Sequence, residues 1–240
     1  MTLLRWFVGA LLVLPILLAG GAAWAYPTLG AAMCPSCYGF ERIAPHVFVQ
    51  SSMPAGQRAR LRNDLRAAQA RVARHLGPFP ERYAVLVCAT FGCDRRLGGR
   101  GAPATTFTTP FGSAIRVAPR GANRTILAHE LAHVRIHDLA GWRQQVSGVL
   151  PAWFDEGLAV IVSDDRRYLT LDGAPRACGE ADAPPLPASP FDWAPRSGRE
   201  PDIYAHAVCA VARWMDAHGG MDGAIAALRA GTTGRIGALR

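Results

Sequence analysis

The spacing of apolar positions changes along the chain, from short alternating or continuous runs in the first half to helical spacing in the second. "HVFVQ" (46–50) alternates between apolar and polar residues, as a half-buried strand does. "YAVLVCA" (83–89) is a continuous apolar run with the length of a buried strand, and "SAIRVA" (113–118) is a further short apolar segment. These patterns predict three strands.

Five longer segments are predicted to be helices. Asn123 is suited to cap the N-terminus of one helix and Gly141 to end it, while Pro151 is suited to the first turn of the next. The predicted helices are 55–77, which is rich in Ala, Leu and Arg, and 123–141, 151–163, 203–219 and 221–231.

Two segments between these elements are predicted to be irregular. Residues 92–112 are rich in Gly, Thr and Pro, which predicts a loop or an irregular edge. Residues 179–202 contain six prolines, which predicts a long ordered loop or lid. The order of strand, helix, strands and then helices predicts an α+β domain, with a small, mostly antiparallel sheet packed on a helical half.

The N-terminal segment, residues 1–25, has the features of a membrane anchor or a secretory signal peptide. After Arg5, an uncharged and mostly apolar run extends to residue 25, close to the roughly 20 residues of a transmembrane helix. "AWA" (23–25) could instead form the cleavage site of a signal peptide. The length of the run favours an anchor, and Arg5 then places the following domain outside the cytoplasm.

The rest of the chain is expected to form a short neck and one domain. Residues 26–45 contain several prolines and glycines, which predicts an irregular neck. Residues 46–240 are long enough for a single domain with a sizeable core. Half of all residues are hydrophobic, which argues against global disorder.

The net charge of +8 does not indicate a nucleic-acid partner. All 26 basic residues are arginines, they are spread along the chain, and no run of them alternates with aromatic residues suited to base stacking. We therefore interpret the charge as a composition bias that makes every surface cation an arginine.

Six cysteines agree with a location outside the cytoplasm, where an even number predicts disulfides. The C-x-x-C motif at 34–37 could alternatively be a redox pair, but that requires a βαβ context and a helix N-terminus, and neither is predicted there. The predicted pairs are local: Cys34–Cys37, Cys88–Cys93 and Cys178–Cys209.

The chemistry of the chain is concentrated in "HELAH" (129–133), an H-E-x-x-H pattern on a predicted helix. His129 and His133 lie one turn apart on one face, so both imidazoles can reach one zinc ion. Glu130 can then act as a general base on a zinc-activated water. The alternative is a helix with two ordinary histidines, but in this apolar setting a buried histidine pair and carboxylate need a compensating partner, such as a metal.

The third ligand does not follow the metzincin pattern, which requires glycine and histidine where this chain has Ile136 and Leu139. His137 is one turn beyond His133. Three ligands at i, i+4 and i+8 on a straight helix cannot converge on one tetrahedral ion, so we interpret His137 as an ordinary helix residue.

Glu156, in "LPAWFDEGLAV", is the better third ligand. It lies on the next predicted helix, which can pack antiparallel to the first. Its otherwise apolar surroundings make a buried carboxylate without a function costly. Asp155 fits the ordinary role of a first-turn acid favoured by the helix dipole.

The two motifs together, "HELAH" and "LPAWFDEGLA", resemble those of the gluzincin metallopeptidases, especially the small bacterial peptidase-MA-like domains, and "YAHAVCAVARWM" resembles the helix that follows. The resemblance spans roughly residues 46–231. It implies a zincin-like fold and one Zn²⁺ per chain, with Glu130 acting as base and then as acid. Val160 stands where thermolysin-type members carry an acidic residue, and no amine-anchoring motif is recognisable, so neither specificity is implied. The implied metal ligands are His129, His133 and Glu156.

The resemblance also implies a tyrosine or histidine that stabilises the oxyanion of the tetrahedral intermediate. Tyr204 and His206 are the candidates, and the alternatives are a tyrosine at a helix start and a surface histidine. Substrate is expected to pair with a sheet edge, for which 103–118 is the candidate.

These expectations describe a zinc-dependent peptidase outside the cytoplasm, either anchored in the cell membrane through its N-terminal helix or secreted after cleavage. Its partners would be a peptide or protein substrate and the membrane, with no nucleic acid, and the sequence carries no signal for an oligomeric state. The alternative is a catalytically inactive gluzincin-fold module that binds peptides or envelope proteins.

Overall fold

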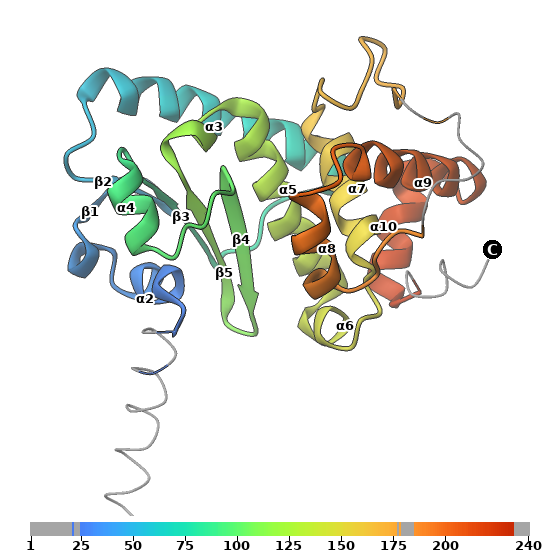
Figure 1. Cartoon of the computed structure of the whole chain (residues 1–240), viewed down its shortest axis with the longest axis horizontal. Coiled ribbons are helices and arrows are strands. Elements are labelled where there is room, and N and C mark those ends of the chain that lie inside the picture. Colours follow the sequence, from blue (N-terminus) through green and yellow to red (C-terminus); the bar gives the residue numbers. More distant parts are fainter. Residues whose placement is uncertain (1–20, 22–24, 177, 179–184, 233–240) are drawn as a thin grey trace, which may run out of the picture. The chain divides into compact units, whose positions relative to one another are not determined.

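The first half of the chain contains a five-stranded mixed sheet (Figure 1). Its strand order is β1-β2-β3-β5-β4, with β1 antiparallel to β2 and β2 parallel to β3. β3 is buried at all five positions, as its continuous apolar sequence predicts. The strands are β1 (Phe40–Ala44), β2 (Val47–Gln50), β3 (Tyr83–Val87), β4 (Ala104–Thr109) and β5 (Gly112–Val117).

The computed structural model describes residues 21, 25–176, 178 and 185–232. The predicted anchor or signal segment, 1–25, lies outside these residues except for Gly21 and Ala25. Within the described ranges, no helix combines the length and the apolar character that crossing a membrane requires.

The chain divides into two compact units, each described here by itself. The sheet lies in the first unit except for the strand ends at 83, 108–109 and 112–113, which belong to the second. The first unit comprises Met1–Ala59, Ala84–Phe107 and Ala114–Ala122, and the second comprises Arg60–Tyr83, Thr108–Ser113 and Asn123–Arg240.

The sheet differs from the mostly antiparallel one that the sequence predicted. β2 and β3 pair in parallel, with Phe48 opposite Leu86. The connection between them contains the helix α3 (Ala55–Leu76), and a connection of this kind joins parallel strands rather than a hairpin. The α+β class is confirmed.

Residues 26–45 are ordered rather than irregular. They form α2 (Pro27–Met33), a 3₁₀ turn at Pro35–Tyr38 and the edge strand β1. Ala31 and Phe40 are buried in a core cluster of the first unit together with residues of β3 and of the short helix α4 (Phe91–Arg96). The prolines were interpreted as signs of irregular structure, but Pro27 and Pro35 lie in the first turns of their helices, where proline is favourable.

All three predicted disulfides are present, and the described residues contain no free cysteine. Cys34–Cys37 spans the 3₁₀ turn, and Cys88–Cys93 joins the end of β3 to the short helix α4 (Phe91–Arg96). Cys178–Cys209 ties residue 178 to α9 (Ile203–Ala217). Three disulfides are compatible with an oxidising, extracytoplasmic location.

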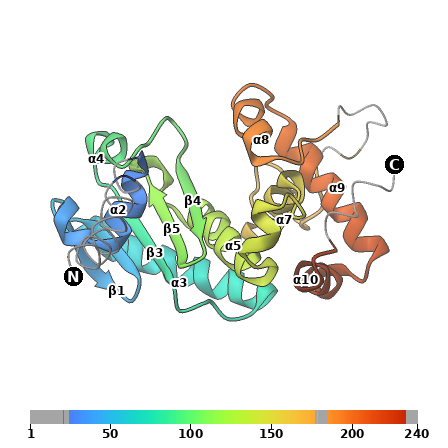
Figure 2. The same cartoon turned by 90° about the horizontal axis from the view of Figure 1, so that it is seen from below.

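The second unit is helical, and α7 (Ala152–Ser163) is its central element. α7 packs on α5 (Arg124–Ala140) on one side and on α9 on the other (Figure 2). Eight of the twelve α7 residues are buried. The remaining helices of this unit among the described residues are α6 (Trp142–Val146), α8 (Pro190–Ser197) and α10 (Gly220–Ala230), and the first unit adds a 3₁₀ turn at Pro119–Gly121.

The predicted N-cap and C-terminal glycine of α5 are both confirmed. The two segments predicted to be loops, by contrast, contain helices and a strand. The Asn123 side chain accepts a hydrogen bond from the Ile126 amide, and Gly141 ends α5 with a positive φ of 73°. Residues 92–112 contain most of α4 and all of β4. Within 179–202, residues 179–184 lie outside the described part, and α8 begins at Pro190 after a Ser189 cap.

Candidate metal centre

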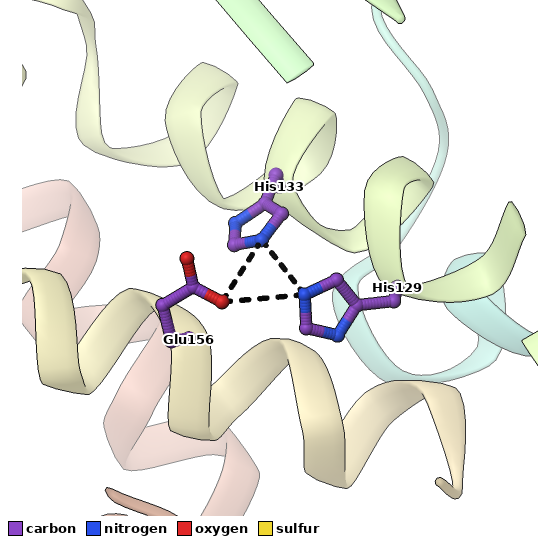
Figure 3. Close-up of side chains that lie close together, drawn as sticks. All are labelled: His129, His133 and Glu156. Carbon is purple, nitrogen blue, oxygen red and sulfur yellow. Dashed lines mark hydrogen bonds and ion pairs between the residues drawn. The ribbon is translucent and has the colours of Figure 1, made fainter. Parts of the chain in front are cut away.

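Three potential ligand atoms from two helices converge in the second unit. Nε2 of His129 lies 3.1 Å from Nε2 of His133, and both atoms come from α5. Oε2 of Glu156, on α7, lies 3.3 Å from the first nitrogen and 3.7 Å from the second. Figure 3 shows the three side chains pointing toward one another, with α5 and α7 on opposite sides.

This triangle of atoms fits a tetrahedral metal ion. Bonds of about 2.0–2.1 Å to zinc place tetrahedral ligand atoms about 3.3–3.4 Å apart, close to the three observed separations. Two imidazole nitrogens and one carboxylate oxygen are also a donor set typical of zinc.

The carboxylate supplies an independent test of the fit. Oε2 of Glu156 is buried and has no hydrogen-bond partner within the described residues. Its neighbours within ion-pair distance are the two imidazole nitrogens, so a compensating contact depends on a proton on one of these rings. A cation among the three atoms would provide that contact.

The electrostatics of the group favour a bound cation. Burial raises the pKa of Glu156, but the His133 and His129 rings outweigh this effect and lower the pKa to about 2. Burial also opposes a charge on His133, but Asp155 and Glu156 outweigh it and raise the His133 pKa well above its ordinary value. Two carboxylates thus face the His133 ring, and a metal ion could balance their charge in place of a proton on His133.

Asp155 connects His133 to His137. Its Oδ1 lies 2.8 Å from Nδ1 of His133, and its Oδ2 lies 2.8 Å from Nε2 of His137. Burial raises the pKa of Asp155, but the two rings outweigh burial and hold the pKa far below its usual range. The expectation that Asp155 and His137 are ordinary helix residues is therefore wrong, because both belong to the hydrogen-bond network around the candidate ligand His133.

Glu130 and Tyr204 lie beside the triad. Glu130 follows His129 on α5, and its side chain is buried. Burial raises the pKa of Tyr204, and the negative charges of Glu156 and Glu130 raise it further. The Tyr204 ring lies 6.3 Å from the His129 ring, centroid to centroid. Tyr204 therefore stays protonated at neutral pH and faces the group.

His206 is not brought to this group. Residues two apart on a helix point about 200° apart, so Tyr204 and His206 cannot both face His129. His206 instead acts electrostatically on Glu200. Of the two oxyanion candidates, Tyr204 is the one whose ring contacts a candidate ligand, His129.

Tyr168 is a neighbour that the sequence analysis missed. Its ring stacks on Tyr204 with centroids 5.4 Å apart, and burial raises its pKa. It follows α7 in a turn that no motif marks, so only the tertiary structure identifies it. Val160, by contrast, packs in an apolar cluster with Leu169 and Val208, as expected for a position without a catalytic role.

Gly157 allows α7 to approach α9 closely. A Cβ atom at this position would lie 2.6 Å from the Ala207 carbonyl oxygen and 2.8 Å from a methyl carbon of Val211. Because a backbone oxygen cannot move independently, any side chain here would push the two helices apart. The glycine next to Glu156 thus helps to set the position of the ligand-bearing helix.

Gly157→Ala is therefore expected to lower the free energy of unfolding by about 1–3 kcal/mol, the usual cost of an overpacked core. Urea titration followed by circular dichroism would measure the change. Gly56→Ala on α3 is the matched control, because a Cβ there meets nothing within 4 Å, and this variant should be as stable as wild type or slightly more stable. Equal stability of the two variants would contradict the close contact at Gly157.

Comparison of the chain with protein-family models, with curated proteins and with solved structures finds no match in any of the three. The functional proposal therefore rests on the sequence motifs and on the geometry of the described residues.

Proposed function

We propose that this protein is a zinc metallopeptidase of gluzincin type, with a zincin-like fold, that cleaves peptide bonds outside the cytoplasm. The observation that carries the proposal is the convergence of His129, His133 and the buried Oε2 of Glu156. The sequence motifs and the three disulfides agree with it. The N-terminal apolar segment would anchor the protein in the membrane or export it.

In this mechanism His129, His133 and Glu156 would hold one zinc ion. When bound, zinc supplies a Lewis acid that acidifies water and polarises a carbonyl group. The Glu130 carboxylate accepts the proton of the attacking water and then delivers it to the leaving amine. The position of Glu130 directly after His129 and the burial of its side chain support this assignment.

Tyr204 would donate a hydrogen bond to the developing oxyanion. Its raised pKa keeps the hydroxyl proton in place, which is what an oxyanion donor requires. Contacts with Trp193 and Tyr168 fix the orientation of its ring.

Tyr204→Phe is expected to lower kcat/KM by about 100-fold or more, mainly through kcat, since the hydrogen bond strengthens in the transition state. Steady-state kinetics on a cleaved peptide would measure it. His206→Ala, on the opposite face of α9, is the control and should keep wild-type kinetics. An unchanged kcat in Tyr204→Phe would remove Tyr204 from this role.

The substrate is proposed to pair with the end of the edge strand β4 at Thr108 and Thr109, which belongs to the second unit. Thr108, near the end of β4, contacts His137 of α5 within the second unit, which supports a strand end close to the metal-binding helix.

The test of the proposed function is metal content and cleavage of a peptide library by the purified full-length chain. We expect about one zinc per chain, and cleavage that is lost with a chelator and restored by zinc. A chain that holds no zinc would refute the proposal. A chain that holds zinc but cleaves nothing would favour the alternative, a non-catalytic module that binds peptides or envelope proteins.

A further inference from the structure

A continuous chain of hydrogen bonds leads from the metal ligand His133 to the tip of the β4–β5 hairpin, all within the second unit. It runs from His133 to Asp155, from Asp155 to His137, and from His137 Nδ1 to Thr108 Oγ1 at 2.8 Å. Thr108 Oγ1 lies 3.0 Å from Ser113 Oγ. Apart from His133, none of the residues in this hydrogen-bond network is a proposed metal ligand.

The chemistry of these groups fixes the direction of each hydrogen bond. His133 must keep Nε2 free of a proton to bind metal, so its Nδ1 carries the hydrogen and donates to Asp155. Ionised Asp155 only accepts, so Nε2 of His137 donates to it. With its hydrogen on Nε2, His137 accepts from the Thr108 hydroxyl at Nδ1. In this assignment each hydrogen bond of the network has one donor and one acceptor.

We propose that His137, held by Thr108, is a positioning residue that fixes Asp155 and, through it, the metal-binding ring of His133. The proposal rests on the proposed function, since it assumes that His133 binds the metal. Carboxylate groups that orient ligand histidines in this way typically contribute 10–100-fold to metal affinity. Here the carboxylate is itself held by a second histidine and a hairpin hydroxyl.

A second metal ion is the competing explanation, because His133, His137 and Asp155 also form a group within metal-binding distance. That arrangement would use both nitrogens of His133 as ligands and would require the ring to lose both protons. The two 2.8 Å contacts of the carboxylate already satisfy both rings as ordinary hydrogen bonds. The hydrogen-bonded chain needs no such ionisation.

Zinc and cobalt binding by the full-length chain tests this positioning role without any measurement of activity. His137→Ala is expected to raise the dissociation constant for zinc by about 10–100-fold and to shift the visible absorption of bound Co²⁺. The stoichiometry should stay at one metal per chain. Thr108→Val, which removes only the hydroxyl, should weaken zinc binding in the same direction. Thr108→Ser, which keeps the hydroxyl, should bind like wild type.

His218→Ala is the matched control, because His218 bonds only to its own helix, at the Trp214 carbonyl, and should leave zinc affinity unchanged. Thermal unfolding of the metal-free variants checks that each is folded. Wild-type affinity and an unchanged cobalt spectrum in both His137→Ala and Thr108→Val would overturn the positioning role. Two metals in wild type and one in His137→Ala would overturn it in favour of a second metal ion. If wild type binds no metal, the proposed function itself fails.

Discussion

Glu156→Gln is expected to remove zinc from the protein under conditions in which wild type keeps about one ion per chain. Glutamine has nearly the shape of glutamate, but it replaces the negative oxygen with a neutral amide. The loss should exceed the 10–100-fold effect typical of residues that only orient a ligand, because Glu156 contributes a ligand atom and the charge that balances the ion. Equilibrium dialysis followed by metal analysis would measure it.

The geometry makes this prediction specific. Oε2 of Glu156 is the buried oxygen without a hydrogen bond, and it faces both imidazole nitrogens. Glu200→Gln is the control, because Glu200 pairs with Arg196 away from the metal ligands and should keep full zinc binding. His129→Ala should lose zinc in the same way as Glu156→Gln. Full zinc affinity in Glu156→Gln would show that the carboxylate is not a ligand.

Glu130→Gln is expected to keep zinc but to lower kcat/KM by about 10²–10⁴-fold, the usual contribution of a general base. The amide of glutamine cannot accept the proton of the attacking water. The ligand atoms of His129, His133 and Glu156 are untouched, so the metal should stay bound. Peptide cleavage and zinc content measured on the same preparation would separate the two effects.

Activity and zinc content together show whether Glu130 acts in catalysis or in zinc binding. Loss of activity with retained zinc would establish Glu130 as the base rather than as a structural residue. Cleavage at the wild-type rate in Glu130→Gln would contradict the mechanism, and loss of zinc would show that Glu130 supports the site instead. Glu200→Gln again serves as the control and should keep wild-type kinetics.

Many features of the fold followed from local sequence signals. The Asn123 cap, the Gly141 stop and the apolar spacing between them fixed α5 to within a residue at each end. The continuous apolar run at 83–89 correctly predicted a strand buried at every position. The same approach failed at residues 26–45 and in the parallel pairing of β2 with β3, because strand partners are separated in sequence and their pairing depends on contacts that a local pattern does not contain.

The sequence by itself determined the helices α5 and α7 and named His129, His133 and Glu156 as candidate ligands, because an i, i+4 spacing and a helix period are local properties. Only the tertiary structure decided which neighbours face those ligands. Tyr204 rather than His206 points at the group because α9 packs on α7 through that face. His137 and Asp155 have a role only because the hairpin brings Thr108 to the far side of the His137 ring. Such contacts join residues distant in sequence, so helical spacing alone could not reveal them.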